Sequence, residues 1–288
     1  MRIVLLSVLL AALACAGCGS GDQPAASARL KVDRFDARRA FAELRREVEL
    51  GPRPAGSRRL RRLAVRLKRD LPRGRFEAVP GHPGLRNIVG TLPGAKPAVV
   101  VAAHYDTKKL PGFVGANDGA GGTAAVLELA RVLRHTRRPA GAPELRFVLF
   151  DGEEATNDKA DFVLTGLRGS QAYARRHASE LRAVVLLDFI ANKGLRIPRE
   201  AGSDPQLWSR LRAAAKRVGA GSAFPAGDLQ GEITDDHTPF ARAGIPAIDL
   251  IDFDFPCWHK TCDDLAAVSQ SSLDRSGEAV LELLRTWR

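Results

Sequence analysis

Ionisable side chains follow four apolar segments of this chain, at positions where the strands of a sheet would end. They are His104, the acid pair Glu153 and Glu154, Asp188 and, a few residues past the last apolar run, His259. In an open α/β sheet, ligands bind outside the carboxyl ends of the strands, so we expect these side chains to meet at one edge. Two histidines with several carboxylates indicate a zinc site with a further carboxylate left for proton transfer.

Hydrophobic periodicity predicts the elements that must position these residues. Strands are predicted at 75–79, 87–92, 98–103, 145–150, 183–189 and 246–251, and helices at 36–49 (Phe41 and Leu44 inward), 58–69, 121–134, 169–177, 205–218 and 273–287, with a short helix near Pro239. Strands alternating with helices predict a three-layer α/β/α sandwich with a mixed, mostly parallel central sheet. We find no internal repeat and no boundary after residue 35, so residues 35–288 are expected to form a single domain.

The N-terminus has the features of an export signal. Residues 1–18 combine a short basic start, an apolar run and small residues, which predicts a signal peptide. The run Ala16-Gly17-Cys18 resembles a bacterial lipoprotein processing site, which would lipidate Cys18, although Cys15 is atypical and a plain secretory signal is the alternative. Residues 19–34 predict a flexible tether. We therefore expect an exported protein, tethered to the outer face of the cell membrane or secreted.

The formal net charge of +11 and the block Arg58 to Arg69 raise the question of a nucleic-acid partner. The apolar residues of this block fall at helical spacing, which places the arginines on the solvated face of an amphipathic helix. No aromatic side chains are interleaved for base stacking, so we expect no nucleic acid. A basic surface would suit anionic lipid headgroups. No exposed apolar helix stands out, which favours a monomer. In the arginine-rich helix, the residues predicted to face inward are Leu60, Leu63, Ala64, Leu67 and Leu71.

Each candidate residue also has an ordinary structural explanation. Asp118 precedes a helix and could be its N-cap, and an acid pair could simply face solvent. Asp188 ends an apolar strand, where a carboxylate without a partner would be costly to bury. It is the joint placement at one sheet edge that favours a functional set. Cys257 and Cys262 flank the candidate histidine, and an exported protein allows a disulfide between them; zinc thiolates are the alternative.

Taken together, the motifs resemble those of the zinc peptidase family M28 and, within it, of the glutaminyl-peptide cyclotransferases. The resemblance rests on 51–57, His104-Tyr-Asp-Thr107, Asp151-Gly-Glu-Glu154, Asp235-Asp-His-Thr-Pro-Phe240 and Trp258-His259. It implies that Asp118, Glu154 and His259 bind one zinc ion and that Glu153 is the general acid/base. It also implies that His104, oriented by Asp106, and Asp188 could bind a second zinc ion, as in the aminopeptidases of the family.

The same resemblance favours the cyclotransferases over the aminopeptidases. The doubled acid Asp235-Asp236 is typical of the former, in which the first acid forms a hydrogen-bonded network with the residues matching Glu153 and Asp188. The pocket wall is expected at Ile251, Phe255 and Trp258. The expected substrate is a peptide or protein N-terminus, with glutamine cyclised to pyroglutamate. An M28-type aminopeptidase is the main alternative, favoured by the cysteines around the ligand histidine, and a catalytically silent binding module on this fold is the third.

Overall fold

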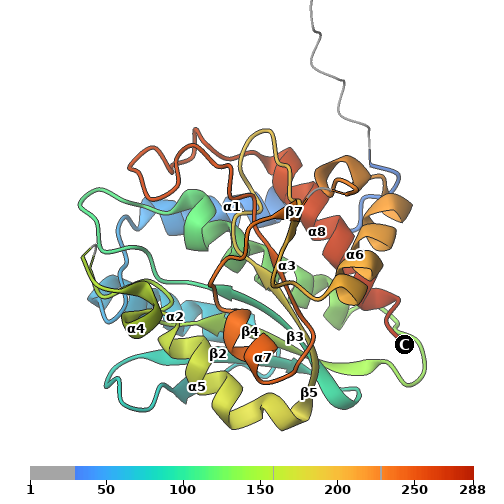
Figure 1. The fold of residues 1–288 in the computed structure, drawn as a ribbon, viewed down its shortest axis with the longest axis horizontal. Coiled ribbons are helices and arrows are strands. Elements are labelled where there is room, and N and C mark those ends of the chain that lie inside the picture. Colours follow the sequence, from blue (N-terminus) through green and yellow to red (C-terminus); the bar gives the residue numbers. More distant parts are fainter. Residues whose placement is uncertain (1–29, 158, 228) are drawn as a thin grey trace, which may run out of the picture.

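The computed structural model describes residues 30–157, 159–227 and 229–288, and a six-stranded sheet lies at its centre (Figure 1). The strand order is β1-β2-β4-β3-β5-β8. The first three strands of this order pair antiparallel, and the pairs of β4, β3, β5 and β8 are parallel. The strands are β1 (Arg75–Ala78), β2 (Arg86–Leu92), β3 (Ala95–His104), β4 (Pro143–Phe150), β5 (Leu181–Leu187) and β8 (Ala247–Leu250).

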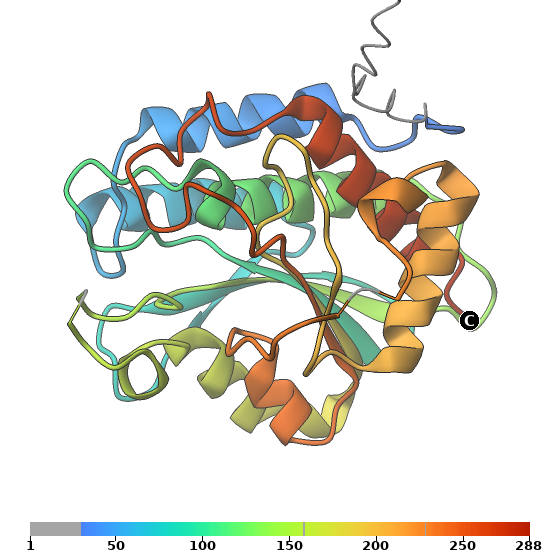
Figure 2. The ribbon, with the colours of Figure 1, turned by 45° about the horizontal axis from the view of Figure 1, so that its top comes forward.

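Both faces of the sheet are covered, which explains the nearly continuous apolar runs of its central strands. Along β3, Val99 and Val101 face one hydrophobic core and Val100 and Ala102 face the other. The view in Figure 2 shows helices above and below the sheet. One layer holds α1 (Ala37–Glu49), α2 (Arg58–Asp70), α3 (Gly122–Arg134), α6 (Pro205–Val218) and α8 (Gln270–Arg285), and the other holds α5 (Arg168–His177) and α7 (Thr238–Arg242). The three-layer sandwich is confirmed.

The Arg-rich helix α2 is amphipathic as predicted. All five expected inward residues are buried, whereas Arg58, Arg61 and Arg62 are exposed. Ser57 caps its N-terminus by accepting the backbone N–H of Leu60. Helix α1 differs from expectation in one respect, because Phe41 is only half-buried. The inner stripe of α1 runs through small and aliphatic residues, and Phe41 lies at its edge, where Arg45 covers its ring.

Short elements escaped the sequence prediction because they span too few residues to show a period. They include the helix α4 (Phe162–Thr165), the strand pair β6 (Arg199–Glu200) and β7 (Leu229–Gln230), and a π-helical turn over Ala116–Gly121. The π-helical turn leads directly into α3, so the predicted start of that helix falls within the turn. This turn carries the candidate ligand Asp118.

The predicted signal peptide, Cys18 and residues 19–29 lie outside the described residues. The last residues of the predicted tether lie against the domain: the backbone N–H of Lys31 donates to Val218 O at 2.8 Å, and that of Arg34 donates to Glu278. Within 30–157, 159–227 and 229–288, no helix is long and apolar enough to cross a membrane.

Candidate metal centre

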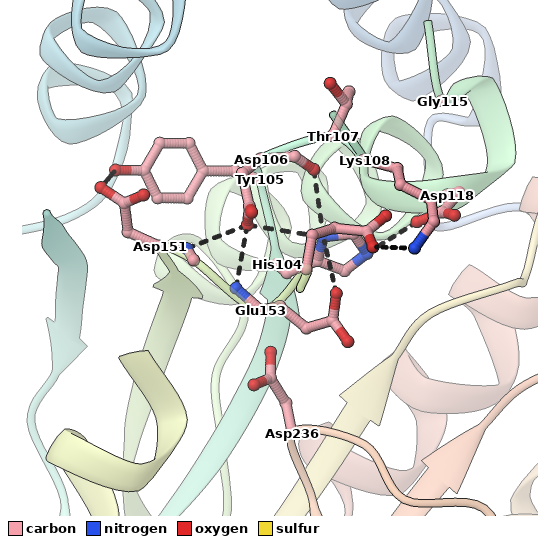
Figure 3. Close-up of polar contacts among 12 residues, drawn as sticks. His104, Tyr105, Asp106, Thr107, Lys108, Gly115, Asp118, Asp151, Glu153 and Asp236 are labelled. Atoms are coloured by element: carbon pink, nitrogen blue, oxygen red, sulfur yellow. Dashed lines mark hydrogen bonds and ion pairs between the residues drawn. The ribbon is translucent and has the colours of Figure 1, made fainter. Parts of the chain in front are cut away.

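The loops after β3, β4, β5 and β8 place the predicted residues at one edge of the sheet. His104 ends β3, the acid pair follows β4, Asp188 follows β5, and His259 lies in the loop after β8. These strands are neighbours and run parallel, so their carboxyl ends meet. Figure 3 shows His104, Asp118 and Glu153 converging there.

Asp118, Glu154 and His259 form the first candidate metal site. One ligand atom from each lies within 4.8 Å of the others. His259 Nε2 is 3.6 Å from Asp118 Oδ2 and 3.9 Å from Glu154 Oε2. Asp118 Oδ2 and Glu154 Oε1 are buried and accept no hydrogen bond from the described residues, which is costly unless a cation satisfies them. Two carboxylates and an imidazole are a donor set that fits zinc.

His104, Asp118 and Asp188 form a second group of the same kind, so Asp118 belongs to both. His104 Nε2 lies 3.1 Å from Asp118 Oδ1 and 3.3 Å from Asp188 Oδ1, and Nδ1 lies 3.1 Å from Asp106 O. If Nδ1–H donates to that carbonyl, Nε2 faces two carboxylates and requires a proton or a metal ion. Burial alone would lower the pKa of His104, but hydrogen bonding to the side chains of Asp106, Asp118 and Asp188 raises it well above its usual value.

The π-helical turn decides between the two interpretations of Asp118. The N-cap of α3 is Gly121, with no side-chain hydrogen bond, so the Asp118 carboxylate is free to point into the site. Gly115 and Gly119 allow the turn, with φ of 53° and 96°. A Cβ on Gly115 would lie 2.2 Å from Asp118 O. The backbone geometry therefore requires glycine beside the shared ligand.

Two buried charged residues to which the sequence analysis assigned no role hold this loop. The Asp263 carboxylate accepts the backbone N–H of Asp118 at 3.0 Å and that of the preceding residue at 2.8 Å. Arg53 is fully buried and donates from Nη1 to Val114 O at 2.6 Å and from Nη2 to Gly115 O at 3.2 Å. Arg53 lies in the motif 51–57, and this arginine is the feature of the sequence that could have indicated a role in holding the loop.

Glu153 lies beside both groups, and its loop is held by Asp106. Asp106 Oδ1 accepts the backbone N–H groups of Gly152 and Glu153 at 3.1 and 3.2 Å, and is 3.8 Å from His104 Nδ1. Asp106 therefore orients the acid pair as well as the histidine. Burial raises the pKa of Glu153 well above its usual value; His104 opposes this, and the neighbouring carboxylates of Glu154 and Asp235 add to it.

Asp235 lines the cavity and also belongs to a buried cluster with His237 and Asp249. Among the described residues, its Oδ1 accepts the backbone N–H of Asp236 at 2.5 Å, and its Oδ2 has no hydrogen-bond partner. The expected direct hydrogen bonds to Glu153 and Asp188 are therefore not among the contacts of the described residues. The charge of Asp235 nevertheless acts on Asp188: burial, followed by Asp235, raises the pKa of Asp188 well above its usual value. Asp249 on β8, which the sequence did not single out, lies within the same cluster.

A cavity of about 460 Å³ opens next to these residues. Ile251 and Trp258 line it as expected, whereas Phe255 lies outside the lining residues, buried behind Phe189 with the ring centroids 6.0 Å apart. The buried Phe189 and the exposed Phe253 line the cavity instead, with their rings stacked and the centroids 6.3 Å apart. Phe255 is turned inward because it packs with Phe189 and Ile251 in a small separate core.

The predicted disulfide between Cys257 and Cys262 is confirmed. It closes a loop of which His259 is part, and His259 itself has a φ of 51°, in the left-handed region that non-glycine residues rarely adopt. The bond excludes these cysteines as zinc thiolates. It also indicates an exported protein, since disulfides persist in oxidising compartments.

Comparisons with known proteins agree with this geometry. A glutaminyl-peptide cyclotransferase-like protein of Mus musculus is 32% identical over 62% of this chain and 54% of its own, so the chain spans about half the length of this curated relative. The structure of an Acidobacteriales bacterium glutaminyl cyclase has a TM-score of 0.77 and 30% identity, over 88% of this chain and 94% of that one. A leucine aminopeptidase precursor from Bacteroides thetaiotaomicron has a TM-score of 0.78 and 25% identity, over 90% and 100%.

The family assignment rests on a match that covers most of the domain. The sequence pattern described as peptidase family M28 matches residues 87–284, a range that contains all of the candidate ligands and Glu153. The fold, the shared-carboxylate arrangement and this match point to the same conclusion. The chain belongs to peptidase family M28.

Proposed function

We propose that this protein is a zinc-dependent glutaminyl-peptide cyclotransferase, which converts the N-terminal glutamine of a peptide into pyroglutamate and releases ammonia. The observation that carries this proposal is the position of the buried Glu153 carboxyl, which lines the cavity together with Asp118 and His259 of the first metal site. The cyclases among the similar proteins support the choice of substrate.

Asp118, Glu154 and His259 would hold the zinc ion. When bound, the ion supplies Lewis-acid polarisation of the side-chain amide carbonyl of the substrate. Because Glu154 points to the metal site and Glu153 lines the cavity, the adjacent acids can serve the two purposes separately. The side chain of Lys108, 3.4 Å from Glu154 Oε2, adds a positive charge at the cavity wall.

Glu153 would carry the proton of the reaction. The α-amine of the substrate attacks the side-chain amide carbon, and Glu153 accepts the amine proton and passes it to the departing ammonia, so a C–N bond forms and another breaks. Asp188 and Asp235 line the same cavity and would share a proton and hydrogen bonds during turnover, since close carboxylates resist ionising together. The aromatic wall of Phe189, Phe253 and Trp258 would enclose the aliphatic part of the substrate.

An M28-type aminopeptidase is the second candidate, and one observation favours it. His104, Asp118 and Asp188 offer a second metal position that shares Asp118 with the first. In an aminopeptidase the two groups would hold two metal ions, which would supply Lewis-acid activation of a water molecule, and Glu153 would act as the base toward that water. The two candidates differ in the number of zinc ions and in the bond that is broken.

The wider setting is part of this proposal. We infer that residues 35–288 form one catalytic domain, that Cys18 anchors an exported protein at the outer face of the cell membrane, and that the protein acts as a monomer on peptide N-termini without a nucleic-acid partner. The disulfide supports export. The docking of residues 31–34 against the domain means that any free tether would end before Lys31.

Substitution of Glu153→Gln tests the catalytic assignment. We expect ammonia release from a glutaminyl dipeptide to fall by roughly 10²–10⁴-fold, because the amide cannot accept the amine proton. Zinc content should stay unchanged. Glu232→Gln is the matched control, since Glu232 lines the same cavity but is exposed, and its rate should stay near that of the unsubstituted protein. Retained turnover in Glu153→Gln would remove Glu153 from this role.

A further inference from the structure

A surface groove beside the reaction cavity has no part in the proposed chemistry. It has a volume of about 530 Å³ and lies between α5 and α7, which pack side by side on one face of the sheet (Figures 1 and 2). Thr234 lines both the groove and the cavity, and the segment of α4 contributes Phe162 to the cavity and Val163 to the groove. A peptide that leaves the cavity across Thr234 and α4 would therefore enter the groove.

Most of the side chains that line the groove are apolar. Leu167, Ala174 and Pro239 line it together with Val163. Val163 is 51% exposed, and the adjacent Leu164 is 80% exposed, the highest value among the large apolar side chains that the structure describes. Exposed apolar surface beside a cavity is typical of a binding site, so an apolar side chain of a ligand would be favoured here.

Two arginines give the groove a positive charge. Arg175 of α5 and Arg242 of α7 line it, and both are exposed. Neither forms an ion pair with another described residue, and Arg175 Nη1 donates instead to the neutral side chain of Gln171 at 3.4 Å. Among the described residues, no acidic side chain lines the groove. Both guanidinium groups are therefore available to a carboxylate, whose geometry they match.

The sign of the charge changes between the cavity and the groove. Carboxylates predominate in the cavity, where Lys108 and His259 are the basic residues among the described lining. An acidic residue directly after the N-terminal glutamine would therefore be repelled, whereas an acidic residue further along the peptide would be attracted by the groove. The acids of the cavity are Asp118, Glu153, Asp188, Glu232 and Asp235.

We propose that this groove binds the downstream part of the peptide substrate and selects peptides in which an apolar residue and then an acidic residue follow the N-terminal glutamine. The inference rests on the proposed function, because it assigns the substrate that the cavity takes. The peptide would cross α4, place an apolar side chain against Val163 and bring a carboxylate to Arg175 and Arg242. The continuity of the groove with the cavity favours a peptide over a lipid surface.

Ammonia release from a set of glutaminyl octapeptides tests this inference. Each peptide is amidated at its C-terminus and carries leucine after the N-terminal glutamine, and a single glutamate is moved from the third to the eighth position. The reference peptides carry glutamine in place of that glutamate. We expect glutamate beyond the third position to lower KM by roughly threefold, with little change in kcat, and high salt to remove the difference, because exposed ion pairs are weak and screened.

The double variant Arg175→Gln/Arg242→Gln should bring the KM ratio of neutral to acidic peptide close to one. The control Arg176→Gln/Arg182→Gln removes the same charge from exposed positions outside the groove and should keep the ratio. Because the ratio compares two peptides on one protein, a general loss of stability would not change it. The inference would be overturned if no glutamate position lowered KM, or if Arg175→Gln/Arg242→Gln kept the ratio of the control.

Peptide binding gives a readout that does not depend on turnover. Fluorescence anisotropy of a labelled acidic octapeptide, measured with Glu153→Gln, should show roughly threefold weaker binding when Arg175→Gln/Arg242→Gln is added. This difference without any ammonia release would refute the proposed cyclotransferase and keep the groove as a peptide site. Ammonia release from a dipeptide, with no effect of glutamate on KM or binding, would do the reverse. Loss of binding to phosphatidylglycerol vesicles in Arg175→Gln/Arg242→Gln, with the peptide ratio unchanged, would overturn the inference in favour of a membrane contact.

Discussion

Arg53 should stabilise the fold and position the metal ligand Asp118 by separable means. Its Nε lies 3.7 Å from Glu47 Oε2, and both side chains are fully buried. Within the part of the chain that the structure describes, neither oxygen of Glu47 has a hydrogen-bond partner, so Arg53→Met would leave the carboxyl uncompensated. Breaking a buried ion pair costs about 3–5 kcal/mol. Burial raises the pKa of Glu47 to about 8, so the carboxyl should take up a proton when Arg53 is replaced. The loss of stability should therefore lie at the lower end of this range, about 3 kcal/mol.

The second contribution of Arg53 is to the Asp118 loop. Arg53→Met also removes the donors to the carbonyls of Val114 and Gly115, which precede the π-helical turn. We expect weaker zinc binding as a result. The double variant Glu47→Leu/Arg53→Met replaces the pair by apolar side chains, a change that often leaves stability nearly unaltered. It should therefore recover most of the stability without recovering zinc affinity.

Two measurements check this separation: chemical unfolding for stability, and competition with a chelating zinc indicator for affinity. Arg62→Met is the matched control, since Arg62 is exposed on α2, and both of its values should stay near those of the unsubstituted protein. The reasoning is refuted if Arg53→Met loses less than about 1 kcal/mol, far below the expected cost. It is also refuted if the double variant recovers zinc affinity together with stability.

Three further predictions concern other parts of the domain. Burial opposes ionisation of Glu200, but hydrogen bonding from His237 and from two backbone N–H groups lowers its pKa from 4.5 to about 2. The ionised carboxylate therefore contributes about 3 kcal/mol to the free energy of unfolding above pH 4.5, and this contribution is lost as the pH falls through 2. Glu200→Gln should flatten the acid side of the stability profile, measured by unfolding between pH 2 and 6. Replacing Cys257 and Cys262 by serine should cost roughly 2 kcal/mol from loop closure, measured by thermal unfolding, and weaken zinc binding by His259; an unchanged zinc affinity would contradict the second part. Phe253→Ala should raise KM with little change in kcat in steady-state kinetics, because Phe253 lines the cavity but is neither a candidate metal ligand nor a proton-transfer residue. A loss confined to kcat would contradict this.

The parallel part of the sheet could be predicted because its strands are buried on both faces and end in polar residues. The convergence of His104, Glu153 and Asp188 follows from that topology. The disulfide could be predicted because two nearby cysteines lie in a chain with an export signal. Local patterns were sufficient wherever a single element or one sheet edge decides the position of a residue.

The residues that the sequence did not reveal depend on contacts between distant segments. Arg53 and Asp263 hold the Asp118 loop from positions far away in the chain, and no local period marks them. Phe255 and Phe253 lie two residues apart in one loop, and only the packing against Phe189 shows which of them faces the cavity. Sequence pattern identifies the strand ends, whereas long-range packing decides how loop side chains are turned.

The central claim is tested most directly by two assays run in parallel on one zinc-loaded sample. One measures ammonia release from a glutaminyl dipeptide, and the other measures hydrolysis of a leucyl anilide. The proposed cyclotransferase should release ammonia and leave the anilide intact. Hydrolysis of the anilide without ammonia release would contradict the proposal and would assign His104 and Asp188 to a second metal ion of an aminopeptidase.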